Sequence, residues 1–136
     1  MPKFFTVDEA NQTLPLVRRI VADIVSAHQQ LLEGIDEYRA ADPNVEASSA
    51  RRRELEKEMQ ELTDRVNGFV AELEEIGAEF KGFEEGLVDF HGMLDGRAVL
   101  LCWKMGEESI EWWHELDAGY RGRQRLPAHL LSAGQS

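Results

Sequence analysis

The sequence predicts an α+β fold in which a long antiparallel two-helix hairpin, similar to a coiled coil, packs with a small antiparallel β-sheet of about three strands. Two long segments carry apolar residues at alternating intervals of three and four, which is the spacing of a helical seam. After Gly77 the apolar interval changes to two, which is typical of strands. Glycines at turn positions then divide the rest of the chain into short extended runs.

The first helix is expected to begin at about residue 7, because Thr6 and Glu9 form a capping box. Pro15 removes one backbone hydrogen bond. The sequence therefore predicts a short first helix, then a kink or break, with Pro15 near the first turn of a longer helix. The longer helix is expected to end near Ala41, before the breaking residues 42–44. Its seam consists of Leu14, Val17, Val21, Ile24, His28, Leu31, Ile35 and Tyr38.

The second helix is expected to begin after Ser48 and Ser49, either of which can cap it. Gly77 is expected to end it in a left-handed conformation. The two long helices are roughly 25 residues each, or about 38 Å. Because the loop between them is short, they should be antiparallel neighbours. The second seam consists of Leu55, Met59, Leu62, Val66, Phe69, Leu73 and Ile76.

Three strands are expected after the helices. Residues 88–91 alternate apolar side chains with an aspartate and a histidine, as a short strand does. Residues 98–105 are almost continuously apolar, which is typical of a strand buried on both faces. Residues 109–115 return as the third strand. The turns between the strands are expected at Asp95-Gly96 and Gly106-Glu107.

The length of 136 residues predicts a single domain over residues 1–136, with a helical part (7–77), a β unit (78–126) and a tail (127–136). The final residues, 132–136, are expected to fray. The 15 basic and 26 acidic residues give a net charge of −11, so neither nucleic acid nor an anionic membrane surface is an expected partner.

Three further features favour a cytoplasmic location. The only cysteine, Cys102, excludes an intrachain disulfide and is compatible with a reducing compartment. The sequence contains no run of about 18 apolar residues, which is the length needed to span a membrane. The first residues show no apolar segment or cleavage site of a secretory signal.

Short motifs follow one another along most of the chain. They are Phe5-Thr6-x-x-Glu9-Ala10-Asn11-x-x-Leu14-Pro15, Gly86-Leu87-Val88-Asp89-Phe90, Leu101-Cys102-Trp103, Gly106-Glu107, Trp113-His114-Glu115 and Gly119-Tyr120-x-Gly122-Arg123. Taken together, this ordered set resembles the bacterial domain-of-unknown-function family 2203. The resemblance implies a small bacterial protein, with no established activity for the family and a suggested role in metal binding.

The candidate metal ligands lie in the β unit and are His114, Asp89, Glu115 and His91. A histidine and carboxylates from different strands can hold zinc, manganese, iron or another divalent ion. Asp89 is expected to be a metal ligand, a hydrogen-bond partner that orients His114, or an exposed strand residue. His91 is expected on the same face of the strand as Asp89. His114 and Glu115 face apart on a regular strand, so a site requires His114 to turn toward Asp89. The alternative for His114 is a packed, hydrogen-bonded histidine among tryptophans.

Other candidates have simpler interpretations. Cys102, between leucines and a tryptophan, is expected to be a small buried residue rather than a nucleophile. His28 in the first seam either sets the register of helix pairing or is a half-buried histidine. Arg121, Arg123 and Arg125 are expected to pair with the protein's own carboxylates. The chain has no Gly-x-Ser-x-Gly elbow, glycine-rich phosphate loop or His-Glu-x-x-His motif.

Two functional hypotheses follow. In the first, the β unit binds a divalent metal through histidine and carboxylate ligands. In the second, the protein is a non-enzymatic interaction module, and the helix seams form a homodimer. The polar residues of the β unit favour the first hypothesis, and the length of the seams favours the second.

Overall fold

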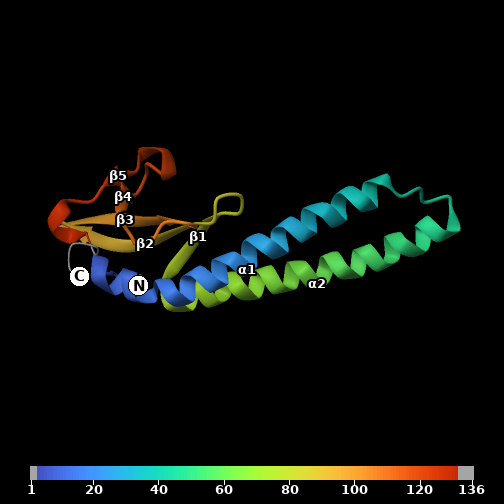
Figure 1. The fold of residues 1–136 in the computed structure, drawn as a ribbon, viewed down its shortest axis with the longest axis horizontal. Coiled ribbons are helices and arrows are strands. Elements are labelled where there is room, and N and C mark those ends of the chain that lie inside the picture. The colour runs from blue at the N-terminus through green and yellow to red at the C-terminus, as the bar shows by residue number, and fades with distance from the viewer. Residues whose placement is uncertain (1–2, 132–136) are drawn as a thin grey trace.

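A computed structural model describes residues 3–131 as two long helices followed by an antiparallel sheet of five strands. Helix α1 spans Val7–Ala40 and helix α2 spans Glu46–Ile76. The helices form a hairpin that projects beyond the sheet at one end (Figure 1). The predicted α+β class and helical hairpin are therefore confirmed. Within the described residues, no helix is long and apolar enough to cross a membrane.

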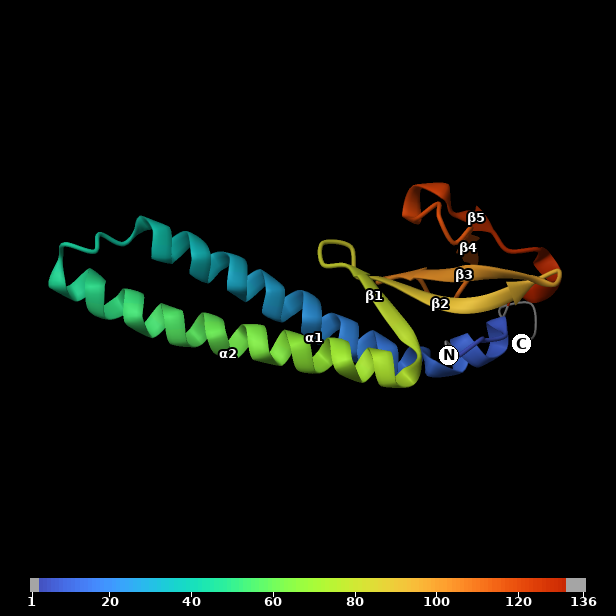
Figure 2. The same cartoon turned by 180° about the vertical axis from the view of Figure 1, so that it is seen from behind.

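Helix α1 begins at the predicted capping box. The Thr6 hydroxyl accepts from the Glu9 amide at 3.0 Å, and the Glu9 carboxylate accepts from the Thr6 amide at 2.8 Å. The predicted short first helix is wrong, because Pro15 lies inside one continuous helix. Leu14 and Val17, the seam residues before and after the proline, are both buried, and this burial offsets the lost backbone bond. The ribbon nevertheless changes direction in the first part of α1, as helices containing proline do (Figure 2).

Helix α2 begins earlier than predicted. Ser48 and Ser49 lie inside the helix, and the residue before its first turn, Val45, makes no side-chain cap. Glu46 in the first turn instead places a negative charge at the positive end of the helix dipole. Gly77 ends the helix with a φ of 104°, as predicted. A side chain at Gly77 would also collide with the Phe5 ring, which lies 2.8 Å from the position of a Cβ atom.

The sheet has five strands rather than about three, in the order β1-β2-β3-β4-β5. The strands are β1 (Ala78–Gly82), β2 (Leu87–Leu94), β3 (Arg97–Lys104), β4 (Trp112–His114) and β5 (Gln124–Arg125). The predicted strands correspond to β2, β3 and β4. Strand β1 was missed because it follows Gly77 directly, and β5 was missed because two residues show no periodicity. Central strand β3 is buried from Val99 to Trp103, as its apolar composition predicts.

The two faces of the sheet have different surroundings. One face packs on α1 and α2 and forms the core with their seams. Its main residues are Ala78, Val88, Phe90, Val99, Leu101, Trp103 and Trp113. Because side chains alternate along a strand, Asp89 and Cys102 point to the other face. The segment that connects β4 to β5 borders this second face, which therefore lies between the sheet and a loop rather than in the helical core.

The burial of the α1 seam decreases along the hairpin. Near the sheet, Val21 and Ile24 are fully buried, whereas Leu31, Ile35 and Tyr38 are only half-buried in the projecting part. His28 is also half-buried, and its ring stacks on Phe83 in the β1–β2 loop with 4.4 Å between ring centroids. The predicted fraying of residues 132–136 lies outside the described residues.

Candidate functional site

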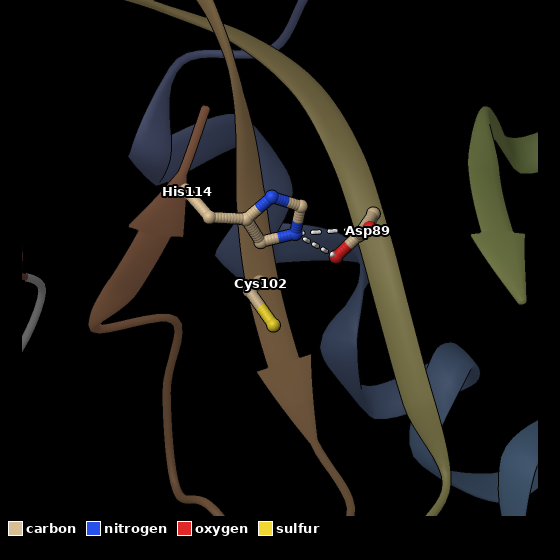
Figure 3. A group of neighbouring side chains, drawn as sticks. All are labelled: Asp89, Cys102 and His114. Atoms are coloured by element: carbon tan, nitrogen blue, oxygen red, sulfur yellow. Dashed lines mark hydrogen bonds and ion pairs between the residues drawn. The ribbon is translucent and has the colours of Figure 1, made fainter. Parts of the chain in front are cut away.

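Three buried side chains with metal-binding chemistry meet on the sheet face that points away from the helices. They are Asp89 of β2, Cys102 of β3 and His114 of β4, one from each of three adjacent strands (Figure 3). One ligand atom of each residue lies within 4.8 Å of those of the other two. Asp89 is 4% exposed and His114 is 2% exposed, so this polar cluster is removed from bulk water.

Strand pairing explains how the cluster forms. Asp89 is directly opposite Cys102, and His114 is opposite Leu100, which is two residues from Cys102 on the same face. The ring of His114 turns toward Asp89, with Nε2 at 3.1 and 3.2 Å from the two carboxylate oxygens. This is the orientation that the sequence-based hypothesis required.

The hydrogen bonds of His114 define where its protons can be. Nδ1 lies 2.8 Å from the carbonyl oxygen of Glu115, which can only accept, so Nδ1 carries a proton and donates it. In the neutral ring, Nε2 then has a lone pair that faces the carboxylate oxygens of Asp89. Two acceptors that face each other in a buried site repel each other. A proton or a metal cation between Nε2 and the carboxylate removes that repulsion.

Cys102 belongs to the same cluster. Burial raises the pKa of its thiol from 9.0 to about 12, and the nearby Asp89 carboxylate adds to the effect. The thiol is therefore protonated at neutral pH in the absence of a bound cation. Its burial agrees with the sequence prediction, but its place beside His114 was missed. The signal that could have found it is the antiparallel pairing of residues 89 and 102 across the Asp95-Gly96 turn.

The folded protein is expected to react with an aromatic disulfide reagent at pH 8 at least about 100-fold more slowly than the urea-unfolded chain. A pKa of about 12 in place of 9.0 lowers the thiolate fraction by about 1000-fold, and burial further limits access. The neutral thiol also contributes stability below pH 9, which is lost as the pH rises toward 12. Equal reaction rates for folded and unfolded protein would show that Cys102 is accessible.

A pocket of about 390 Å³ lies over the cluster. Asp89, Cys102 and His114 line its inner side. Its outer side includes exposed residues such as Lys81 and Leu116, so the pocket connects the cluster with the surface. Its remaining lining residues are Leu87, Leu100, Asp117, Ala118, Gly119 and Tyr120. The cluster is thus buried at the base of a pocket whose other side reaches the surface.

Residues 3–126 match the family described as Uncharacterized conserved protein (DUF2203). The chain belongs to the DUF2203 family. No curated protein and no solved structure matches it. The resemblance drawn from the ordered motifs is confirmed, and the matched segment of this DUF2203 member includes all three cluster residues.

Two of the four predicted metal ligands in this DUF2203 member lie away from the cluster. His91 shares the face of Asp89, but its Nε2 is 2.6 Å from the Glu79 carboxylate. Lys81, which also binds Glu79, and to a smaller extent His91 lower the pKa of that carboxyl. The Glu115 carboxylate accepts from Arg97 at 2.9 Å. The structure therefore brings together only Asp89 and His114 from the predicted set.

The arginines near the C-terminus mainly hold the loop beside the pocket. The Arg123 guanidinium donates two hydrogen bonds to Glu107 at 2.9 and 3.0 Å and lies over the ring of Trp112 at 4.8 Å. Arg125 pairs with Glu111. These two arginines pair with carboxylates of the chain, as predicted. Arg121 is exposed in a short 3₁₀ turn, so the three arginines do not share one side of an extended strand.

Proposed function

We propose that this protein binds a divalent metal ion, with zinc the best match, through Asp89, Cys102 and His114. The observation that carries the proposal is the orientation of the His114 ring. Its Nδ1 donates a hydrogen bond to the Glu115 carbonyl, while its Nε2 faces the Asp89 carboxylate. Metal-bound histidines commonly donate their other ring N–H to a carbonyl or carboxylate. A cation at Nε2 would convert two repelling acceptors into two ligands.

The donor set favours zinc over the other ions considered. Oxygen, sulfur and nitrogen ligands are all common at zinc sites, whereas a thiolate is a poor match for manganese. Zinc bonds of about 2.0–2.1 Å place tetrahedral oxygen and nitrogen ligands about 3.3 Å apart. The 3.1 Å distance from Nε2 to Oδ2 of Asp89 is close to that value. Iron(II) with the same ligands is the next best match.

Three protein ligands would leave one position of a tetrahedral ion unfilled. All three residues line the pocket, so that position would face it. Zinc sites with three protein ligands generally hold an exchangeable water or substrate in the fourth position. The arrangement supports a metal ion that is accessible to small molecules rather than a closed structural site.

Nucleophilic catalysis by Cys102 is less well supported than metal binding. A cysteine nucleophile that is activated by histidine needs a ring nitrogen that is free to take its proton. Both ring nitrogens of His114 instead face oxygen atoms, and burial raises the pKa of the thiol to about 12. These contacts match a metal ligand better than a catalytic base.

Protein purified without an affinity tag and dialysed against zinc is expected to contain about one equivalent of zinc by elemental analysis. Loss of one of three ligands should weaken binding by more than the 10–100-fold typical of supporting residues, so His114→Ala should lose the ion. His91→Ala is the matched control, because His91 lies outside the cluster, and it should retain the metal. The proposal fails if zinc, manganese and iron(II) all remain at background in the unaltered protein.

A second candidate function is a homodimer formed through the helices. The α1 seam away from the sheet supports it, because Leu32 is 48% exposed and the seam residues Leu31 and Ile35 are only half-buried. We expect sedimentation equilibrium to show a dimer at micromolar concentrations, and Leu32→Glu to shift it toward the monomer. A monomer at all accessible concentrations would contradict this form of the hypothesis.

A further inference from the structure

We propose that the pocket over the cluster binds a small molecule with a carboxylate or phosphate group, one oxygen of which fills the open metal position. The inference rests on the proposed metal site and adds the chemical class of its ligand. A pocket of about 390 Å³ is suited to a small metabolite rather than a polymer. Tyr120, which lines this pocket, and Lys104, which contacts Tyr120, indicate an anion.

The main positive group is Lys104, which does not itself line the pocket but contacts Tyr120, which does. It lies two residues after Cys102 on β3 and so on the same face, with about 7 Å between the two Cα atoms. Its ammonium group donates to the Tyr120 hydroxyl at 3.4 Å. Within residues 3–131 it forms no ion pair, and the nearby Glu107 carboxylate is bound by Arg123. The ammonium group of a half-buried lysine that forms no ion pair is suited to an anionic ligand.

Tyr120 supplies a second donor and lines the pocket. Because its oxygen accepts from Lys104, its own hydroxyl proton can be donated to a ligand. The ring is held in place by Arg123, whose guanidinium lies 5.0 Å from the ring centroid. Arg123 is in turn fixed by Glu107. The donors therefore have a preformed position at the side of the pocket.

The other charged residues limit where an anion can lie. Lys81 also lines the pocket, but its ammonium group forms an ion pair with Glu79 at 3.0 Å. Asp117 lines the pocket too and would repel a nearby anion. Leu87 lies opposite Lys104 in the strand pairing and is an apolar residue of the pocket lining. A ligand with one oxygen at the metal and another near Lys104 and Tyr120 satisfies all these contacts.

The test uses the full-length protein loaded with cobalt(II), whose visible absorption reports its ligands. Phosphate and oxalate are added separately, and sodium chloride serves as the ionic-strength control. Each anion is expected to change the cobalt spectrum with saturation in the millimolar range. Lys104→Met should weaken this binding at least tenfold, and Tyr120→Phe should weaken it several-fold. Lys57→Met, an exposed lysine of α2, is the matched control and should change nothing.

The outcomes separate this inference from the proposal on which it rests. If cobalt binds but neither anion alters its spectrum, the ligand class is wrong and the metal site stands. If cobalt does not bind, both proposals fail. Equal anion affinities in Lys104→Met and Lys57→Met overturn the assignment to Lys104. Should Lys104→Met fail to fold, an unchanged affinity in Tyr120→Phe overturns it instead.

Discussion

Replacement of Trp103 by alanine is expected to lower the free energy of unfolding by about 3–5 kcal/mol. The Trp103 side chain is fully buried on the sheet face that packs on the helices. Its indole N–H donates to the Glu107 carbonyl at 3.0 Å, so the substitution removes both apolar contacts and a hydrogen bond. A cavity between the sheet and α1 would remain, because a close-packed core relaxes only partly.

Urea denaturation followed by circular dichroism measures this loss. Trp112→Ala is the matched control, because Trp112 is half-buried on the opposite face, where its ring lies under Arg123. We expect a loss below about 2 kcal/mol for Trp112→Ala. Similar losses for the two variants would contradict the division of the sheet into a packing face and a site face.

The helical part of the fold was the most predictable from sequence. A seam repeated over many turns specifies a helix strongly, because each interval independently favours the same buried stripe. The positions at which the helices begin were less predictable. Pro15 and Ser48 were interpreted by local rules, but burial of the seam carries α1 through the proline, and α2 begins before the serines. Tertiary packing outweighs a local preference of a few kcal/mol.

The sheet and the site depend on pairing between strands, which alternation within one strand does not specify. Alternation predicted that Asp89 and His91 share a face, as they do. It could not show that His91 would meet Glu79 of the unpredicted strand β1. Nor could it show that Cys102 would lie opposite Asp89, because its apolar neighbours suggested only a buried residue. The cluster is thus determined by strand register, and Cys102, its proposed sulfur ligand, was the residue hardest to recognise.

Zinc at about 100 times its dissociation constant is expected to stabilise the protein by about 2.7 kcal/mol, which corresponds to a rise of roughly 10 °C in Tm. The physical reason is that Asp89, Cys102 and His114 are brought together only in the folded chain, so the ion binds the folded state far better than the unfolded state. Differential scanning fluorimetry with and without zinc measures the shift.

Single substitutions then distinguish a metal site at Asp89, Cys102 and His114 from one that uses the other ligands predicted from the sequence, His91 and Glu115. Asp89→Asn, Cys102→Ser and His114→Gln should each remove most of the zinc-dependent shift, because each replaces one proposed ligand. His91→Gln and Glu115→Gln should keep it, since these side chains bind Glu79 and Arg97 instead. If His91→Gln or Glu115→Gln abolished the shift while Cys102→Ser preserved it, the metal would be held by the histidine and carboxylates alone. The three-strand cluster would then be an internal hydrogen-bonded group of the sheet.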